Sequence, residues 1–459
     1  MLNHDGLRRQ LPQSRLDGCS NGGGSCSGTS ALQEFVVDVD QALGHEDNIY
    51  KLSLIYTACQ VRQYVTGRRT RSRLRRCPAA TFEVVSLLVV FVLLGADAGP
   101  PLAPVSETVV DAGIPAQRLN AQPLGRKVNA ERVERVLNSL SIRERAGQLI
   151  LAYPQIDRVG PVEVGGILFV GNALKNIPRA KEKIDAARVR AKIPPFVSVD
   201  MEGGPSNRMK TVRALRNMPS ARALSLMEDA EVKRWGRRVG EAMKAVGLNL
   251  NLAPVLDVAP SGHMERNGRS FSGDPEIVVQ KSMAYARGLL EAGVVPIGKH
   301  FPGYGDTDGD SDHALVTSDW PQERVFAEAG VFVRAKEALG GVMLANVVYA
   351  AVDDKPAILS TKLVARVHEQ DWLAVTDDIS IALLADAIGG TSEDVLRQAF
   401  LAGNDLLLTT APPDWNKGID YIGILTELAE KEAPAKKQLD ESCRRVLRLK
   451  DRMGLLDSL

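Results

Sequence analysis

The stretch Val294–Gly303, VVPIGKHFPG, shows the pattern that decides the fold, because a short apolar run passes directly into polar residues. Val294–Gly298 is apolar throughout, which is typical of a strand buried on both faces of a parallel sheet. A helical pattern precedes the run at 276–292, and another follows it at 322–339. The sequence here predicts a buried strand between two helices, with Lys299 and His300 at its carboxyl end.

The same strand and helix unit recurs through the rest of the chain. The apolar runs are Gly147–Ala152, Gly165–Val170, Pro195–Val199, Leu248–Leu256, Val294–Gly298, Gly341–Ala345, Leu373–Thr376 and Asp405–Leu408. Helical patterns lie near 176–192, 222–246, 276–292, 322–339, 361–370, 380–402, 416–431 and 437–453. Eight units in about 340 residues favour a closed barrel over a doubly wound sheet, which would usually show a Gly-rich phosphate loop after its first strand, and this chain has none there. We therefore predict an α/β fold, a single (β/α)8 TIM-type barrel preceded by an N-terminal leader outside its core.

The composition is that of an ordinary globular chain. There are 57 Lys+Arg against 56 Asp+Glu, with 44% hydrophobic and 25% charged residues. Neutralising phosphates takes a surplus of basic side chains, so a formal net charge of +1 argues against nucleic-acid binding. The same figures exclude a wholly disordered chain, a collagen repeat and a multi-span membrane protein.

The first part of the chain has the order of a secretory signal. Arg62–Arg76 holds seven arginines and no acid, and it is followed by the apolar run Val84–Leu94 and by Ala96-Asp97-Ala98 before Gly99. A basic region, a short apolar region and an A-x-A site are the three parts of a signal peptide. The apolar run is shorter than the roughly 20 residues that a spanning helix needs.

These features predict four segments. Residues 1–61 form an extension that is either disordered or precedes the true start, and 62–98 form a signal peptide or a membrane anchor. Residues 99–134 form a linker rich in Pro and Ala, and 135–459 form the barrel domain. If the signal is real, the protein is exported to the periplasm or the extracellular space; otherwise it is anchored to a membrane or cytoplasmic.

The cysteines agree with export. Four of the five, Cys19, Cys26, Cys59 and Cys77, lie in the predicted leader, and Cys443 is the one in the barrel domain. Cleavage before Gly99 would leave Cys443 with no partner for a wrong disulfide in an oxidising compartment.

Charged residues gather after the predicted strands. Asp200 follows the strand that ends at Val199, Asp257 follows Leu256, Lys299 and His300 follow Gly298, and Asp377 follows Thr376. The carboxyl ends of barrel strands share one face, where barrel enzymes do their chemistry. We expect these side chains to converge on one site.

A metal site is not expected among these residues. His263, His300 and His313 are the only histidines in the candidate loops, no Cys accompanies them, and HxxxH and HExxH spacings are absent. The alternation DTDGDSD at Asp306–Asp312 resembles the opening of an EF-hand loop, but Thr317 stands where the twelfth-position Glu would be.

Five motifs together resemble glycoside hydrolase family 3, in its single-domain β-N-acetylglucosaminidase (NagZ-like) branch. They are VDMEGG (Val199–Gly204), LAPVLDV (Leu252–Val258), GRSFSGDP (Gly268–Pro275), KHFPGYGDTDGDSDHALV (Lys299–Val316) and VTDDIS (Val375–Ser380). The resemblance covers roughly residues 135–457 and implies a (β/α)8-like barrel.

The resemblance also implies residue roles. Asp377 would be the nucleophile that forms a covalent glycosyl-enzyme, so that the anomeric configuration is retained. Its neighbour Asp378 would be structural. The residues that would hold or support the sugar are Asp200, Arg269, Lys299, His300 and Asp257.

The general acid departs from the family pattern. The branch uses a His in an Asp-Ser-His triplet, with the Asp orienting the His, whereas this chain has Asp310-Ser311-Asp312 followed by His313. His313 is the candidate acid/base if the loop swings it into the site. Asp312 is the alternative, acting as a carboxylic acid with a raised pKa. The third outcome is loss of protonation and poor turnover.

The sequence thus predicts a retaining exo-β-glycosidase, a β-N-acetylhexosaminidase that acts on peptidoglycan fragments or chitooligosaccharides without metal or organic cofactor. Its partner is the carbohydrate substrate, with no nucleic acid and no obligate protein partner. The alternatives are a catalytically impaired sugar-binding barrel, a β-glucosidase or β-xylosidase of the same family, and a phosphorylase.

Overall fold

The structure is a computed structural model, and it describes residues 123–153, 162–410 and 419–459. The described residues all belong to one compact unit of the chain. The predicted extension at 1–61, the predicted signal at 62–98 and most of the predicted linker lie outside them.

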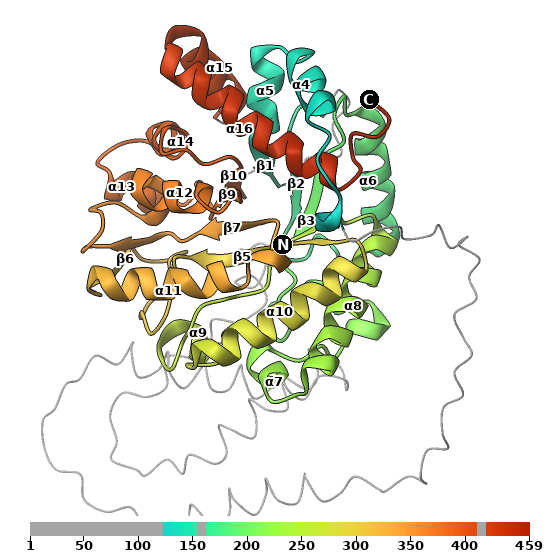
Figure 1. Ribbon diagram of the computed structural model, residues 1–459, viewed down its shortest axis with the longest axis vertical. Coiled ribbons are helices and arrows are strands. Elements are labelled where there is room, and N and C mark those ends of the chain that lie inside the picture. The colour runs from blue at the N-terminus through green and yellow to red at the C-terminus, as the bar shows by residue number, and fades with distance from the viewer. Residues whose placement is uncertain (1–122, 154–161, 411–418) are drawn as a thin grey trace, which may run out of the picture. The chain divides into compact units, whose positions relative to one another are not determined.

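Eight parallel strands form the centre of the molecule (Figure 1), in the order β10-β1-β2-β3-β4-β5-β7-β9. Their bounds are β1 Ile150–Ala152, β2 Gly166–Phe169, β3 Phe196–Val199, β4 Leu250–Asn251, β5 Val295–Phe301, β7 Gly341–Leu344, β9 Leu373–Thr376 and β10 Leu407–Thr409. A parallel bridge between Val375 and Leu406 joins β9 to β10. The predicted (β/α)8 barrel is thereby confirmed, with one strand within each of the eight apolar runs or overlapping it.

The barrel interior is a packed apolar core. Its cluster takes residues from every strand, among them Leu151, Leu168, Phe196, Leu250, Val295, Met343, Leu373 and Leu408. Val446 and Leu449 from α16 belong to the same cluster, so this last helix covers one end of the barrel. A filled interior is the usual state of an eight-stranded barrel.

Helices surround the strands (Figure 1). Their bounds are α4 Ala130–Asn138, α5 Ile142–Gln148, α6 Ile177–Arg190, α7 Ala221–Ser225, α8 Asp229–Val246, α9 Gly262–Arg266, α10 Pro275–Glu291, α11 Gln322–Arg334, α12 Thr361–His368, α13 Ala382–Ala387, α14 Ser392–Leu401, α15 Tyr421–Lys431 and α16 Ala433–Arg452. Single-turn 3₁₀ helices lie at Pro123–Gly125, Arg213–Leu215, Lys336–Ala338 and Ala357–Leu359.

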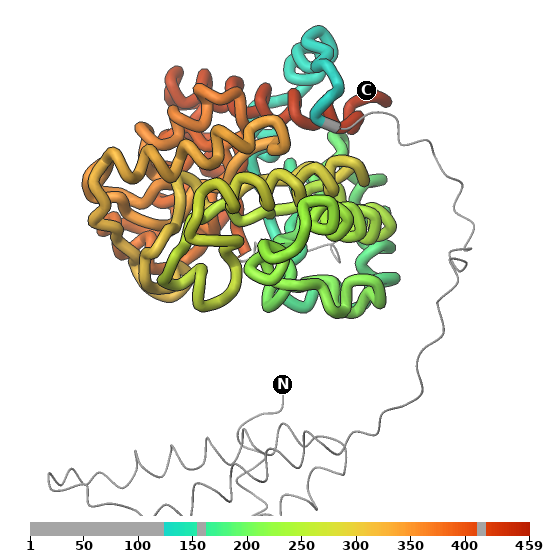
Figure 2. Tube along the Cα trace, turned by 60° about the horizontal axis from the view of Figure 1, so that its bottom comes forward, coloured from blue at the N-terminus to red at the C-terminus, as the bar shows by residue number. Residues whose placement is uncertain are grey.

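Helices α8 and α10 lie side by side, as Figures 1 and 2 show. A Cβ on Gly236 of α8 would come 2.1 Å from the carbonyl oxygen of Tyr285, and a Cβ on Gly288 of α10 would come 2.2 Å from that of Lys233. The two backbones therefore approach closely because neither glycine carries a side chain. The Tyr285 hydroxyl donates to the carbonyl of Met201 at 3.0 Å, which connects this helix pair to the loop after β3.

Helix α4 begins at Ala130, ahead of the expected domain start at residue 135. Its N-cap residue Asn129 donates its backbone N–H to Asp451 of α16 at 2.7 Å, and Glu134 pairs with Arg444 of the same helix. Residues from Asn129 onward are thus part of the folded barrel unit.

A second, two-stranded parallel sheet pairs β6 (Val316–Ser318) with β8 (Val347–Tyr349). It connects the segment after β5 to the segment after β7. In the described part of the chain, no helix is both long enough and apolar enough to cross a bilayer.

Candidate active site

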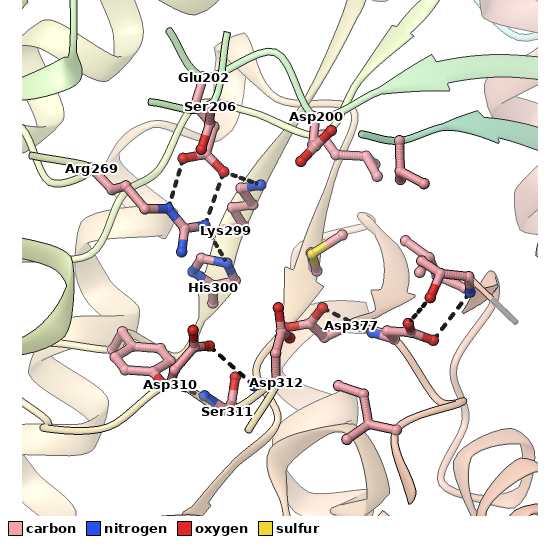
Figure 3. Close-up of a pocket in the computed structure, with 18 of the residues that line it drawn as sticks. Asp200, Glu202, Ser206, Arg269, Lys299, His300, Asp310, Ser311, Asp312 and Asp377 are labelled. Atoms are coloured by element: carbon pink, nitrogen blue, oxygen red, sulfur yellow. Dashed lines mark hydrogen bonds and ion pairs between the residues drawn. The ribbon is translucent and has the colours of Figure 1, made fainter. Parts of the chain in front are cut away.

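A cavity of about 430 Å³ opens at the carboxyl ends of the barrel strands. Its apolar lining includes Leu168, Leu252, Met343 and Leu408. Its polar lining is mostly charged and includes residues from the loops after β3, β5 and β9 (Figure 3). The structure brings Asp200, Arg269, Lys299, His300 and Asp377 to this one cavity, as expected from their places in the sequence.

Glu202 joins two of the predicted sugar-holding residues. Its carboxylate accepts two hydrogen bonds from Arg269, at 2.8 and 2.9 Å. It also forms an ion pair with Lys299 Nζ at 2.6 Å. Burial alone would raise the pKa of Glu202, but the two cations hold that pKa far below its ordinary value. Glu202 thus stays ionised and fixes both cationic side chains at the edge of the cavity (Figure 3).

Asp257 lies behind the cavity and holds the loop after β5. It is fully buried and accepts the His300 backbone N–H at 3.0 Å, the His300 Nδ1–H at 2.8 Å and the Tyr304 backbone N–H at 2.8 Å. A carboxylate accepts hydrogen bonds, so His300 Nδ1 is the donor in this pair. The other ring nitrogen, Nε2, lies 3.5 Å from Arg269 Nη2.

Asp200 is paired with Arg208, a residue to which the sequence analysis assigned no role. The Arg208 Nε lies 2.9 and 3.0 Å from the two carboxylate oxygens of Asp200. Both residues line the cavity, so a ligand would meet a neutralised pair here rather than an isolated carboxylate.

The two acids after β9 have different surroundings. Asp378 accepts hydrogen bonds from the backbone N–H groups of Ser380 (2.9 Å) and Thr410 (3.2 Å) and from both of their hydroxyls. The Asp377 carboxylate accepts the Asp378 backbone N–H at 2.8 Å and otherwise faces the cavity. This geometry suits a structural Asp378 and a reactive Asp377.

The loop after β5 brings Asp312 to the cavity. Asp310, Ser311 and Asp312 all line it, and the Asp312 carboxyl points toward Asp377 (Figure 3). His313 is exposed and does not belong to the cavity lining. In this loop arrangement the structure places the alternative acid, and not the histidine, next to Asp377.

The surroundings of Asp312 favour its protonated form. Partial burial of the carboxyl raises the pKa of Asp312, and the negative charges of Asp377 and Asp310 raise it further. A cavity that holds a nucleophile candidate and a second carboxyl group with a raised pKa suits the division of roles between acid and nucleophile that glycosidases use.

His263, from α9, also lines the cavity. Its ring centroid lies 6.0 Å from that of Tyr304, and its Nε2 lies 3.3 Å from Asn267 Nδ2. Burial, aided by nearby cations, lowers the pKa of His263 despite the opposing charge of Asp310. His263 was recognised from the sequence as a histidine of a candidate loop, but it received no role because it does not directly follow a predicted strand.

The acidic alternation at Asp306–Asp312 is divided among separate contacts. Asp306 accepts from Trp320 Nε1 at 3.1 Å and from Arg324 Nη2 at 2.7 Å, and Asp308 pairs with Arg266 at 2.6 Å. Within the described ranges, no three His, Cys, Asp or Glu side chains are arranged to hold a metal ion.

A closed parallel barrel whose charged cavity at the carboxyl face brings the carboxyl groups of Asp312 and Asp377 together has the features of a barrel glycosidase. Residues 141–449 match the family described as the glycosyl hydrolase family 3 N terminal domain. The chain belongs to this family and is a glycoside hydrolase, acting on O-glycosyl bonds.

Among curated proteins, the chain is similar to a beta-hexosaminidase of Neisseria meningitidis serogroup B. The two are 31% identical over 268 residues, which cover 55% of this chain and 72% of the relative.

Two solved structures are similar in fold. A beta-N-acetylhexosaminidase from Beutenbergia cavernae matches with a TM-score of 0.60 and 26% identity, over 67% of this chain and 98% of that one. A family 3 beta-N-acetylglucosaminidase from Paenibacillus matches with a TM-score of 0.62 and 28% identity, over 69% of this chain and 63% of that one.

Proposed function

We propose that this glycoside hydrolase is a retaining exo-β-N-acetylglucosaminidase that releases N-acetylglucosamine from peptidoglycan fragments or chitooligosaccharides. The observation that carries the proposal is that Asp312 and Asp377 line the same cavity and that the pKa of Asp312 is raised. The preference for an N-acetylated sugar rests on the names of the similar proteins.

In the first step, Asp377 attacks the anomeric carbon and the bond to the leaving group breaks. Asp312 gives its proton to the departing oxygen, so the leaving group departs as a neutral alcohol. The product is a glycosyl ester on Asp377. A water molecule then attacks the same carbon, Asp312 takes the proton from that water, and Asp377 leaves as a carboxylate. The two displacements together retain the β configuration.

The sugar-holding residues have a separate role. Glu202 fixes Arg269 and Lys299, Asp257 fixes His300, and Arg208 fixes Asp200. These side chains present donors and acceptors whose positions are set before a ligand enters. Such preorganisation lets a site distinguish sugar hydroxyls without paying for side-chain ordering at the moment of binding.

The experiment is hydrolysis of an aryl β-N-acetylglucosaminide by the purified protein, with Asp377→Ala as the matched variant. We expect release of the aryl group by the wild-type chain and a loss of at least about 10³-fold in the variant, with sugar binding kept. Saturable binding of N-acetylglucosamine without any release by the wild-type chain would instead show a sugar-binding barrel. A faster reaction with β-glucosides or β-xylosides would contradict the proposed sugar preference, and a rate that requires phosphate would show a phosphorylase.

We also propose that the barrel is exported, on the basis of the basic segment, apolar run and A-x-A site at 62–98. N-terminal sequencing of the protein purified from its native cell tests this. A mature chain that begins at Gly99 is expected, whereas a chain that still begins at Met1 would contradict cleavage.

A further inference from the structure

The hydroxyl of Tyr304 bridges two points of the loop that carries Asp312. It donates to the carbonyl oxygen of Gly309 at 2.9 Å and accepts the backbone N–H of Ser311 at 3.1 Å. Ser311 directly precedes Asp312. A single hydroxyl thus satisfies one acceptor and one donor of the backbone immediately before the proposed acid.

The other end of Tyr304 is attached to the sugar-holding part of the site. Its backbone N–H donates to Asp257 Oδ1, the same oxygen that accepts the backbone N–H of His300. Its ring lies 5.9 Å from the His300 ring in an edge-to-face arrangement, and only 2% of the residue is exposed. Tyr304 is therefore fixed before it contacts the loop.

The remaining contacts divide the loop into two halves. Two ion pairs hold the first half: Arg324 pairs with Asp306, and Arg266 pairs with Asp308. In addition, the His263 backbone N–H donates to the Thr307 carbonyl at 3.2 Å. The second half, Gly309–His313, has local hydrogen bonds, such as Asp312 N–H to Asp310 Oδ1 at 3.1 Å. Among the described residues, the Tyr304 hydroxyl supplies the hydrogen bonds that connect Gly309–Ser311 to the barrel.

The hydroxyl stays protonated under the conditions in which the site works. Burial raises the pKa of Tyr304 to about 12, so near neutral pH the group is a donor as well as an acceptor. Losing it would leave the buried N–H of Ser311 and the carbonyl of Gly309 without this partner, and the loop backbone would lose its hold at both points.

We infer that Tyr304 is a positioning residue for the general acid: its hydroxyl holds the Gly309–Ser311 backbone so that the Asp312 carboxyl faces Asp377. The inference rests on the proposed role of Asp312. It extends that proposal by naming what fixes the acid, since Asp312 and the three residues after it are exposed, whereas Ser311 is buried. In the triplet Asp310-Ser311-Asp312, the loop thus holds a carboxylic acid at the third position, where the Asp-Ser-His pattern of the resembled branch has a histidine.

The test compares two substrates, because proton donation matters only for leaving groups that need a proton. A 2,4-dinitrophenyl β-N-acetylglucosaminide has a leaving group that departs as a stable anion, whereas the leaving sugar of chitobiose must depart as a neutral alcohol. The quantity measured is kcat/KM, which reports the steps up to formation of the glycosyl-enzyme.

Four proteins are compared: the wild-type chain, Tyr304→Phe, Asp312→Asn and the control Tyr349→Phe. The control also removes one hydroxyl from a buried tyrosine, since the Tyr349 hydroxyl donates to the Gly303 carbonyl at 2.7 Å, at the base of the same loop. Melting curves for all four proteins separate effects on folding from effects on the acid.

For Tyr304→Phe we expect kcat/KM to fall about 10- to 100-fold on chitobiose and less than about 3-fold on the dinitrophenyl substrate, as for a weakened general acid. As the pH rises, kcat/KM of Tyr304→Phe on chitobiose should also begin to fall at a different pH from that of the wild-type chain. Tyr349→Phe should keep the wild-type ratio between the two substrates. Asp312→Asn should show the same selectivity as Tyr304→Phe, with a larger loss.

The failures are distinguishable. If Asp312→Asn shows no selective loss on chitobiose, the proposed role of Asp312 is wrong, and the inference about Tyr304 falls with it. If Asp312→Asn is selective but Tyr304→Phe equals the wild type, or loses the same factor on both substrates, Asp312 stands as the acid and the positioning role of Tyr304 is refuted.

Discussion

Asp257 binds His300 through both of its carboxylate oxygens. Asp257 Oδ1 accepts a hydrogen bond from the His300 backbone N–H at 3.0 Å, and Asp257 Oδ2 lies 2.8 Å from the ring Nδ1. The carboxylate is fully buried and also accepts the N–H of Tyr304. It therefore determines both the path of the backbone after β5 and the direction of the imidazole.

Asp257→Asn tests this relationship. The amide group of asparagine would turn a donor toward at least one of three existing donors, because only one of its two terminal atoms accepts. We expect a loss of about 2–4 kcal/mol in the free energy of unfolding and at least about a 10-fold rise in the dissociation constant of N-acetylglucosamine. Urea denaturation and calorimetric titration check the two values, and unchanged sugar binding would show that His300 does not depend on Asp257.

Glu202→Gln tests the buried ion-pair network. The variant leaves Arg269 and Lys299 beside a neutral amide, and removing one partner of a buried charge network costs about 3–5 kcal/mol. We expect a lower unfolding free energy and weaker sugar binding, because the two cations are no longer held. Arg143→Gln is a suitable control, since its pair with Glu163 is exposed and should contribute less than about 1 kcal/mol. Equal losses in both variants would contradict the assignment.

Glu328 predicts a pH dependence of stability. It lies on α11 against Gly303, and its Oε2 is buried without a hydrogen-bond partner. Burial, followed by the negative charge of Asp257, raises the pKa of Glu328 from 4.5 to about 7. Between these two values the folded chain binds more protons than the unfolded chain at this group, so its contribution to stability falls as pH rises through that window.

Glu328→Gln removes that titration. We expect the variant to be more stable than the wild type at pH 8 by about 1–3 kcal/mol, and nearly equal to it at pH 4. Urea denaturation at both pH values gives the comparison. A difference that is the same at both pH values would show that Glu328 does not titrate in this window.

Gly236→Ala tests the close approach of α8 and α10. The added methyl group would meet the Tyr285 carbonyl at 2.1 Å, and such overpacking costs about 1–3 kcal/mol. Gly330→Ala is the matched control in a helix, because a Cβ there meets nothing within 4 Å; it should be neutral or stabilise by up to about 1 kcal/mol. Thermal unfolding separates the two, and an unchanged melting temperature for Gly236→Ala would refute the tight packing.

The fold was predictable because a parallel barrel needs apolar strands. The run Gly341–Ala345 became β7 with little change, since every residue in it is buried between layers. Leu248–Leu256 became a strand over only Leu250–Asn251, and the rest of the run meets β5 at a single bridge between Val255 and Lys299. Apolar content alone does not distinguish a strand from a buried loop.

The missed elements had weak or local signals. Helix α4 carries buried Val133, Val136 and Leu137 at helical spacing, and α5 begins with a capping box between Ser141 and Glu144. The signal for α4 begins inside the predicted linker, 99–134, and the signal for α5 lies shortly after it. Strands β6 and β8 are three residues long each, too short for a period to be recognised.

In the site, position along the strands was predictable and side-chain partnership was not. Asp200, Lys299, His300 and Asp377 lie at strand ends, so the topology itself brings them to one cavity. Which of Asp312 and His313 faces Asp377 depends on the loop conformation. That conformation depends on the Tyr304 hydroxyl, which binds Ser311 within the same loop, and on the distant Asp257, which holds the Tyr304 backbone; no periodic pattern encodes either contact.

The central claim is that Asp377 forms a covalent bond to the sugar, and mass spectrometry of a trapped intermediate tests it most directly. The purified chain is incubated with a 5-fluoro-N-acetylglucosaminyl fluoride, which forms such intermediates faster than they hydrolyse, and is then digested and mapped. We predict one added fluorosugar on the peptide that contains Asp377, and none in Asp377→Ala. A chain that hydrolyses aryl β-N-acetylglucosaminides but carries no label, or carries it on another residue, would contradict the account.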